Sequence, residues 1–573
     1  MVLLKDDEKM VIQNKKWWHE AIGYQIYPKS FQDTNNDGIG DIPGMIEHLD
    51  DLSDLGINVI WISPINLSPM VDHGYDISDY LQIDPSFGTN EEFERLIQEA
   101  EKRGIKVLMD LVINHTSSQH EWFKRAMADL DSKYADYYVI REGRGEEPPN
   151  NWRSMFGGSA WEKIPGTNKY YLHLFTVDQP DLNWENPELR QELYEIIEFW
   201  LTKGLAGFRV DAISHIKKIY DEENLPSDGP DGLVTVWENY RDALGIGEFL
   251  GELRDRVFSK QDILTIAEMD VVDPEKWEEY FGDNGYFSSI FDFYHTAYSI
   301  QGKEFANDSE KFIEFLKPLV YKKQELANDR VFFTNFIENH DLPRSLNRFI
   351  PKEEIGFHSA SVLGMFYFFM RGIPVIYQGQ EIGMVDYPKE TIDGYIDLAT
   401  HNNYQDYLLN GLSETEALAQ INIENRENSR TPMQWNSQTN AGFTKGTPWF
   451  AVNPTYHGLN YQQQKEDPHS LLSFYKEMIQ LRKNPIYKEL LVYGRAVPGF
   501  VEASGVVTYQ RKLEKQTISA LCNLTNQTIA VDYDAKFEVL LNNYAELDCK
   551  TGQLTLLPYQ GVILEETSSV NGK

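Results

Sequence analysis

The chain has 573 residues, 41% of them hydrophobic and 13% aromatic, which is the composition of a globular protein too long for one small core. Its 53 basic and 89 acidic residues give a net charge of −36. This charge argues against nucleic acids and anionic membrane surfaces as partners, and it is compatible with a neutral small-molecule substrate.

The N-terminal stretch, the lack of a long apolar run and the cysteines predict a cytoplasmic protein. The N-terminal stretch MVLLKDDEKMVIQNKK has neither the apolar core nor the cleavage pattern of a secretory signal. No run of about 18 apolar residues could cross a membrane. Only two cysteines occur, Cys522 and Cys549, and we expect both to be reduced thiols.

Short apolar runs alternate with amphipathic segments over the first two thirds of the chain. EEFERLIQEAEKRG at 91–104 and LRQELYEIIEFWLTKG at 189–204 are two such helical segments. Strands that alternate with helices pair in parallel, and eight of them predict an α/β fold, a (β/α)8 TIM barrel. The runs lie at 21–27, 57–62, 105–111, 206–211, 263–268, 288–293, 331–336 and 373–377.

Uneven spacing between the runs predicts additional domains. Residues 117–181, between the third and fourth runs, predict a small inserted domain over the barrel mouth. The catalytic barrel then comprises 1–116 and 182–497, with a subdomain insert near 383–461 and a last helix near 471–484. Short alternating segments such as GVVTYQRKL and TISALCNL predict a C-terminal antiparallel β-sandwich over 498–573.

Charged residues gather where the predicted strands end. Arg209 and Asp211 are two residues apart on one strand, so both side chains point to the same face. In a (β/α)8 barrel the chemistry lies at the carboxyl ends of the strands, and we expect this charge pair to point into the barrel mouth. Two further acids follow other strands, Glu268 and Asp341, and His340 adjoins the second of them.

The motifs around these residues resemble the α-amylase clan of glycoside hydrolases. The similarity is narrowest to its exo-acting α-glucosidases, the group with oligo-1,6-glucosidase, dextran glucosidase and bacterial maltase. The motifs cover nearly the whole chain in order. They are WWHEAIGYQIYPKSFQDTNNDGIGD, DLVINHTS, QPDLNWENP, GFRVDAISH, TIAEM, ENHDLPR, GIPVIYQGQEIGM and RENSRTPMQW.

The resemblance assigns a retaining two-step mechanism to the three acids. Asp211 would be the nucleophile that forms a covalent glucosyl-enzyme, and Glu268 would be the general acid and then the general base. Asp341 would bind sugar hydroxyls and help to distort the ring. Nucleophile and acid must then lie about 5 Å apart. We expect Arg209 to keep the buried Asp211 ionised.

The same resemblance predicts a closed pocket for the non-reducing glucose. Asp72 and Arg426 would pair across its floor, as in the resembled group. Tyr75 would stack on the apolar face of the sugar. His115 and His340 would donate hydrogen bonds to its hydroxyls.

The loop DTNNDGIGD has closely spaced oxygen ligands that suit a hard cation. It imitates the start of an EF-hand, but Gly44 stands where an EF-hand has its bidentate glutamate. In the resembled family this loop binds a structural Ca²⁺, with Mg²⁺ as a further possibility, and we expect no metal in catalysis. The alternative is an Asx-rich turn without metal. The predicted ligands are Asp33, Asn35, Asp37, the carbonyl of Ile39, and Asp41.

One position bears on the linkage that is cleaved. Ala212 follows the nucleophile, and in the resembled group valine there accompanies α-1,6 preference while alanine accompanies α-1,4 preference. A methyl group or two in a pocket contributes about 1–3 kcal/mol, enough for a preference. We therefore expect an exo-α-glucosidase acting on maltose and short α-1,4-linked gluco-oligosaccharides.

Other functions remain open. The main alternatives are an oligo-1,6-glucosidase and a sucrose-active hydrolase or transglucosidase. Glu338, just before NHD, departs from the usual asparagine, and it could place an extra carboxylate near the second sugar. The three acids and the lack of a membrane span argue against a non-enzymatic transporter-escort protein. The expected partner is a small oligosaccharide, with the chain as a monomer or homodimer.

Overall fold

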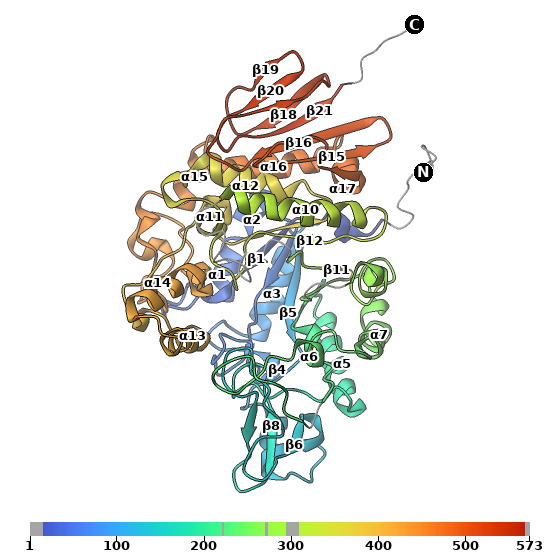
Figure 1. Ribbon diagram of the computed structural model, residues 1–573, viewed down its shortest axis with the longest axis vertical. Coiled ribbons are helices and arrows are strands. Elements are labelled where there is room, and N and C mark those ends of the chain that lie inside the picture. Colours follow the sequence, from blue (N-terminus) through green and yellow to red (C-terminus); the bar gives the residue numbers. More distant parts are fainter. Residues whose placement is uncertain (1–14, 221–222, 270–272, 294–308, 568–573) are drawn as a thin grey trace.

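Eight parallel strands form the centre of the molecule (Figure 1). The computed structural model describes residues 15–220, 223–269, 273–293 and 309–567. Their order in the sheet is β11-β10-β9-β5-β2-β1-β13-β12. The strands are β1 (Gly23–Ile26), β2 (Val59–Ile62), β5 (Lys106–Val112), β9 (Gly207–Asp211), β10 (Leu264–Ala267), β11 (Ser289–Ile290), β12 (Thr334–Asn335) and β13 (Ile373–Tyr377).

The two outer strands of this order meet, so the sheet closes. The N–H of Asp292 donates to the carbonyl of Thr334 at 2.9 Å, and Phe291 pairs in parallel with Thr334. The predicted (β/α)8 barrel is therefore confirmed. The sixth and seventh runs contribute only two strand residues each, while their phenylalanines Phe291, Phe332 and Phe336 fill one apolar cluster with Trp61.

Helices surround the barrel, and most of them bury an apolar face against it. In α5, for example, the side chain of Asn186 accepts N–H bonds from Glu188 and Leu189, and Pro187 occupies the first turn. Leu189, Leu193 and Trp200 then lie buried on one side of that helix. The surrounding helices are α1 (Ile42–Glu47), α2 (Leu49–Leu55), α3 (Asn90–Glu101), α5 (Pro187–Thr202), α7 (Ile246–Arg256), α8 (Trp277–Tyr280), α10 (Ser309–Ala327), α11 (Ser345–Phe349), α12 (Phe357–Phe368) and α16 (Leu471–Lys483).

None of the helices within the described ranges has the length and apolar character needed to cross a bilayer.

The segment between β5 and β9 carries a small antiparallel sheet at the lower end of the view in Figure 1. It consists of β6 (Ile140–Glu142), β7 (Trp161–Lys163) and β8 (Lys169–Leu172) in the order β6-β8-β7, preceded by α4 (Glu121–Ala128). The loop after β9 joins it, since Val234 pairs with Trp152, and Arg153 binds Asp228 and Asp231. This contact could not be predicted, because the loop has no periodic pattern of its own.

A helical hairpin follows β13 and lies to the left of the barrel in Figure 1. It comprises α13 (Leu398–Leu409) and α14 (Glu414–Glu424), which share a small apolar cluster with Tyr395, Tyr404 and Ile421 among its members. A 3-10 turn at Arg426–Arg430 follows, and the chain returns through α15 (Tyr461–Glu466) to α16.

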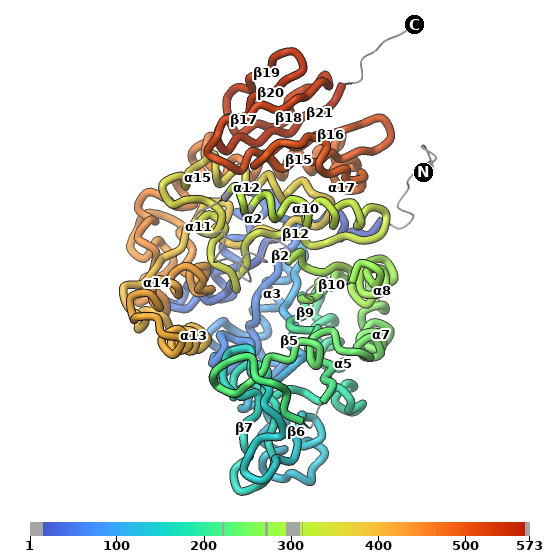
Figure 2. The backbone as a smooth tube through the Cα atoms, in the orientation of Figure 1, coloured from blue at the N-terminus to red at the C-terminus, as the bar shows by residue number. Residues whose placement is uncertain are grey.

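The last part of the chain forms two antiparallel sheets that stack above the barrel helices (Figure 2). The larger has the order β14-β15-β16-β21-β18 and the smaller β17-β20-β19. The two sheets share one buried apolar cluster, which includes Leu521, Val531, Leu554 and Leu564. Strand bounds are β14 (Arg495–Pro498), β15 (Val506–Leu513), β16 (Gln516–Asn523), β17 (Ile529–Asp532), β18 (Phe537–Asn542), β19 (Asp548–Lys550), β20 (Gln553–Leu556) and β21 (Gly561–Glu566).

Two buried arginines lie where this sheet domain meets the barrel helices, and Arg511 joins the two parts. Arg511 on β15 donates to the carbonyls of Phe369, Leu491, Val492 and Gly494. Arg482 on α16 donates to Phe368, Leu491 and Gly372. Most of these carbonyls end α12 and α17 (Lys488–Tyr493), where helix carbonyls lack partners and the dipole is negative.

Candidate active site

Three carboxylates share one buried guanidinium at the ends of β5, β9 and β10. Nη1 of Arg209 lies 2.8 Å from Oδ1 of Asp110 and 2.5 Å from Oδ1 of Asp211. Nη2 of the same residue lies 2.9 Å from Oε1 of Glu268. The expected charge pair at the barrel mouth is therefore a cluster of one cation with three acids.

This sharing changes the expected effect of Arg209 on Asp211. Burial raises the pKa of Asp211 well above its usual value, and Glu268 and Asp110 raise it further, while Arg209 opposes them. Burial likewise raises the pKa of Asp110 to about 6. We expected Arg209 to keep Asp211 ionised by itself. One cation divided among three acids only partly offsets the effect of burial, so the pKa of Asp211 stays raised in the free site.

The turn after β9 connects the first acid to the second. Ala212 has φ 44° and ψ 30°, a left-handed conformation that is uncommon for a residue with a side chain. Its N–H donates to Oε2 of Glu268 at 2.9 Å. The strained turn thus orients the carboxyl group of Glu268 toward Asp211.

Asp341 lies in a strongly positive environment. Its Oδ1 accepts from Nη2 of Arg430 at 2.9 Å and lies 3.4 Å from Nη1 of Arg426. Burial acts to raise the pKa of Asp341, but His340, Arg430, Arg426 and Arg209 together lower it well below the usual range. Asp341 is therefore a permanent carboxylate, suited to accept hydrogen bonds from sugar hydroxyls.

A hydrogen-bonded path joins Asp341 to the three-acid cluster. Nε2 of His340 lies 3.1 Å from Oδ2 of Asp341 and 2.5 Å from the hydroxyl of Tyr75, which donates to Oδ2 of Asp110 at 3.0 Å. Gln25 on β1 contacts the other ring nitrogen of His340 at 2.8 Å. Burial lowers the pKa of His340 to about 3, so the ring is neutral at neutral pH.

The predicted floor of the pocket forms an ion pair. Nη2 of Arg426 lies 3.0 Å from Oδ1 of Asp72, whose other oxygen accepts from Gln179 at 3.0 Å. Gln179 also contacts His115 at 3.1 Å. Burial raises the pKa of Asp72 to about 6, against the lowering effect of Arg426.

The predicted catalytic and sugar-binding residues thus form one network of contacts. Sequence reasoning missed five of its members. Four of them, Gln25, Asp110, Gln179 and Arg430, lie inside motifs that we quoted but were given no role, whereas Asp397 lies in none of these motifs. Asp397 binds Arg426 at 2.7 Å, and it sits in the helical hairpin, which carries no strand-end pattern. The network contains Asp72, Tyr75, His115, Arg209, Asp211, Ala212, Glu268, His340, Asp341 and Arg426.

The predicted calcium loop is a series of Asx turns. Asp33 accepts from the N–H groups of Asn36 and Gly38, and from the hydroxyl of Thr444. Asn35 and Asp37 close similar turns, and Asp41 accepts from Thr34 and caps α1 at the N–H of Gly44.

Within the described residues, no group of three or more acidic, histidine or cysteine side chains is arranged to hold a metal ion. The ligand types in the loop still suit a hard cation. Calcium therefore stays a prediction.

Glu338 does not lie free beside the second sugar. It is 2% exposed, its Oε2 lies 3.1 Å from Nη1 of Arg344, and its Oε1 accepts from the N–H and hydroxyl of Ser345. The idea of an extra carboxylate at the second sugar is therefore wrong.

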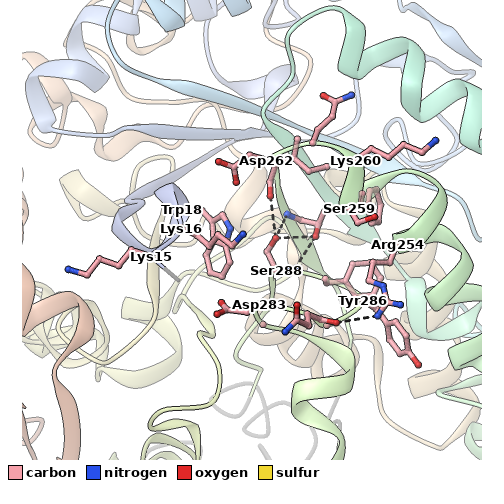
Figure 3. Close-up of a pocket in the computed structure, with 18 residues that line it drawn as sticks. Lys15, Lys16, Trp18, Arg254, Ser259, Lys260, Asp262, Asp283, Tyr286 and Ser288 are labelled. Carbon is pink, nitrogen blue, oxygen red and sulfur yellow. Dashed lines mark hydrogen bonds between the residues drawn. The ribbon is translucent and has the colours of Figure 1, made fainter. Parts of the chain in front are cut away.

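A cavity of about 830 Å³ lies at the opposite end of the barrel (Figure 3). Ile263 and Ser288, which directly precede β10 and β11, line it together with Lys16, Asp262 and Asp283. The acids of the network lie at the other ends of the strands, so this cavity is not the catalytic pocket.

Comparison with known proteins agrees with this geometry. Residues 25–494 match the family "Alpha amylase, catalytic domain". The chain is 38% identical to an oligo-1,6-glucosidase of Bacillus cereus over 96% of its own length and 99% of the relative. It is 42% identical to an alpha-glucosidase of Pediococcus pentosaceus over 82% of its length and 85% of the relative.

A solved structure of trehalose-6-phosphate hydrolase from Bacillus licheniformis superimposes with a TM-score of 0.88. That protein is 36% identical, and the match covers 96% of this chain and 100% of the other.

Proposed function

The chain belongs to the α-amylase family of glycoside hydrolases, and from that premise we propose that it is a retaining exo-α-glucosidase of short gluco-oligosaccharides. The observation that carries this proposal is the contact of both Asp211 and Glu268 with the single guanidinium of Arg209. Two acids on one planar group are close neighbours. This favours the retaining arrangement, in which the carboxyl groups are about 5 Å apart, over the wider inverting one.

The proposed reaction starts with a proton on Glu268 and a carboxylate on Asp211. Glu268 donates this proton to the glycosidic oxygen while an oxygen of Asp211 attacks the anomeric carbon. The bond to the leaving sugar breaks, and a glucosyl ester forms on Asp211. Glu268, now a carboxylate, removes a proton from water, which attacks the same carbon and releases glucose with Asp211 restored.

The remaining network binds and orients the terminal glucose. Asp341 keeps its negative charge and accepts hydroxyl hydrogens near the carbon under attack, where charge develops in the transition state. The Asp72–Arg426 pair, held also by Asp397, would close the pocket behind the non-reducing end. A closed floor favours release of single glucose units from chain ends.

Cleavage of α-1,4 bonds and cleavage of α-1,6 bonds are each supported by a different observation. Ala212 favours α-1,4 bonds by the argument from the residue after the nucleophile, and we propose maltose and short malto-oligosaccharides as the first substrates. The 38% identity to an oligo-1,6-glucosidase favours the second candidate, cleavage of isomaltose.

Initial rates on maltose and isomaltose, with trehalose 6-phosphate and sucrose as further substrates, distinguish these candidates. Faster maltose cleavage with glucose as product supports the first. Faster isomaltose cleavage assigns an oligo-1,6-glucosidase instead. Activity on neither, with rapid cleavage of sucrose or trehalose 6-phosphate, would contradict the proposed substrate class.

We also propose a structural calcium ion in the loop that carries Asp33, Asn35, Asp37, Ile39 and Asp41. Thermal unfolding after exhaustive chelation tests it. Calcium should restore a melting temperature several degrees higher, and Asp37→Asn should reduce that increase, since Asp37 lies in an exposed part of the loop. An identical melting temperature with and without calcium would favour the metal-free Asx turn.

A further inference from the structure

Glu338 and Arg344 form a buried ion pair at the two ends of one short turn. The turn between them, residues 339–343, carries His340 and Asp341. The side chains of Glu338 and Arg344 are 1% and 0% exposed. An ion pair this deeply buried is weak evidence for added stability, because desolvation of the two charges offsets their attraction.

Arg344 connects this turn to two other parts of the barrel mouth. Its Nη1 donates to the carbonyl of Gln378, just after β13, at 2.8 Å. Its Nη2 donates to the carbonyl of Ser429 at 3.2 Å. Ser429 lies between Arg426 and Arg430, the two arginines that contact Asp341.

We propose that Glu338 is a positioning residue for the terminal glucose, acting through Arg344. By holding Arg344, it fixes the turn with His340 and Asp341 against the segment with Arg426 and Arg430. Without its carboxylate, the guanidinium of Arg344 loses its ion-pair partner and keeps its hydrogen bonds to the carbonyls of Gln378 and Ser429, so it is free to shift toward other acceptors. The proposal rests on the proposed function, since it assigns Glu338 to the same sugar-binding site.

Three variants separate positioning from general stability. Glu338→Ala removes the carboxylate, and Glu338→Gln keeps its shape and one acceptor oxygen. Glu381→Gln is the matched control, because Glu381 is a 1% exposed acid that follows β13 as Glu338 follows β12, and it accepts a hydrogen bond from Tyr24 instead. The measurements are KM and kcat for 4-nitrophenyl α-glucoside, the inhibition constant of glucose, and the melting temperature.

The proposal predicts a graded loss of sugar affinity. Glu338→Ala should raise both KM and the glucose inhibition constant at least tenfold, with Glu338→Gln in between and Glu381→Gln within twofold of wild type. The fall in kcat should be smaller than the rise in KM. Arg344→Lys should act like Glu338→Gln, and the double variant should lose less than the sum of the two, since they disrupt one contact.

Other results would overturn it. One is a folded Glu338→Ala with wild-type KM and glucose inhibition, and another is an equal effect of Glu381→Gln. If Glu338→Ala does not fold, the same measurements on Glu338→Gln test the proposal, and wild-type KM and glucose inhibition in that variant would overturn it. If the wild type cleaves no α-glucoside, the proposed function fails. The positioning role is then judged by a crystal structure of Glu338→Gln, where unchanged Arg344–Ser429 and Asp341–Arg430 distances would refute it.

Discussion

Buried arginines have different partners at the barrel mouth and beneath the C-terminal sheets. At the mouth, Arg209 and Arg426 each contact three carboxylates. Beneath the sheets, Arg482 and Arg511 donate to backbone carbonyls at helix ends. At the mouth, carboxylates outnumber these arginines, and carboxylates can accept and donate a proton. Beneath the sheets, the two guanidinium groups face neutral carbonyls, so they can hold the backbone in place but cannot transfer protons.

Burial affects the pKa values in opposite directions in the two regions. It raises the pKa of Asp72 and Asp110 to about 6, and it lowers that of Arg482 to about 10. The same desolvation therefore raises the proton affinity of acids in the region where the proposed reaction transfers a proton. At the interface it is a cost, which the helix carbonyls offset.

The largest expected effect is at the nucleophile. Asp211→Asn should lower kcat by about 10⁴-fold or more, because no covalent intermediate can form. Its melting temperature should not fall, since a buried carboxylate with a raised pKa is replaced by a neutral amide. Kinetics with 4-nitrophenyl α-glucoside and calorimetry measure both. Residual activity within tenfold of wild type would assign the nucleophile elsewhere.

The same substitution in the two regions tests the comparison itself. Arg209→Lys should lower kcat by about 10²–10³-fold, because one ammonium group cannot serve three acids with the geometry of a fork. Arg511→Lys should leave kcat unchanged and lower the free energy of unfolding by about 2–4 kcal/mol, since several helix carbonyls lose charged donors. Urea unfolding gives the second value. Equal loss of kcat in both variants would remove the distinction between the regions.

Stability should fall as pH rises through the range in which the mouth acids ionise. Burial raises the pKa of Asp386 to about 8, although it accepts the N–H of Arg344. Its proton stabilises the fold fully below about pH 4, and this contribution is lost as pH rises through 8, at about 1.4 kcal/mol per unit.

Asp386→Asn stays neutral, so its stability should change less than that of wild type between pH 5 and pH 8. Urea unfolding at both pH values measures the difference, with the exposed Asp393→Asn as control. Identical slopes for wild type and Asp386→Asn would contradict a proton on Asp386.

The smallest expected effect concerns linkage. Ala212→Val should shift the ratio of isomaltose to maltose cleavage upward by about tenfold, in line with 1–3 kcal/mol for the added methyl groups. It should also destabilise the fold by about 1–2 kcal/mol, because a β-branched side chain is strained at φ 44°. A loss of stability without a change of ratio would show that Ala212 does not select the linkage.

Much of this molecule could be predicted from sequence because its signals are local. The eight strands follow from apolar runs, and the acids at their ends follow from the geometry of a barrel. The partition of Arg209 among three acids could not be predicted, since it depends on which strands are neighbours. Glu338 was misjudged for the same reason. Its partner Arg344 is six residues away, and only the turn between them brings the two side chains together.

The central claim is a covalent glucosyl-enzyme on Asp211, and mass spectrometry tests it most directly. Glu268→Gln, which lacks the general base, would be incubated with α-glucosyl fluoride, whose leaving group needs no acid, and then denatured and digested. The account predicts one added glucosyl group on the peptide that contains Asp211. An adduct on Asp341 or another residue would contradict it. So would consumption of α-glucosyl fluoride without any adduct on the protein.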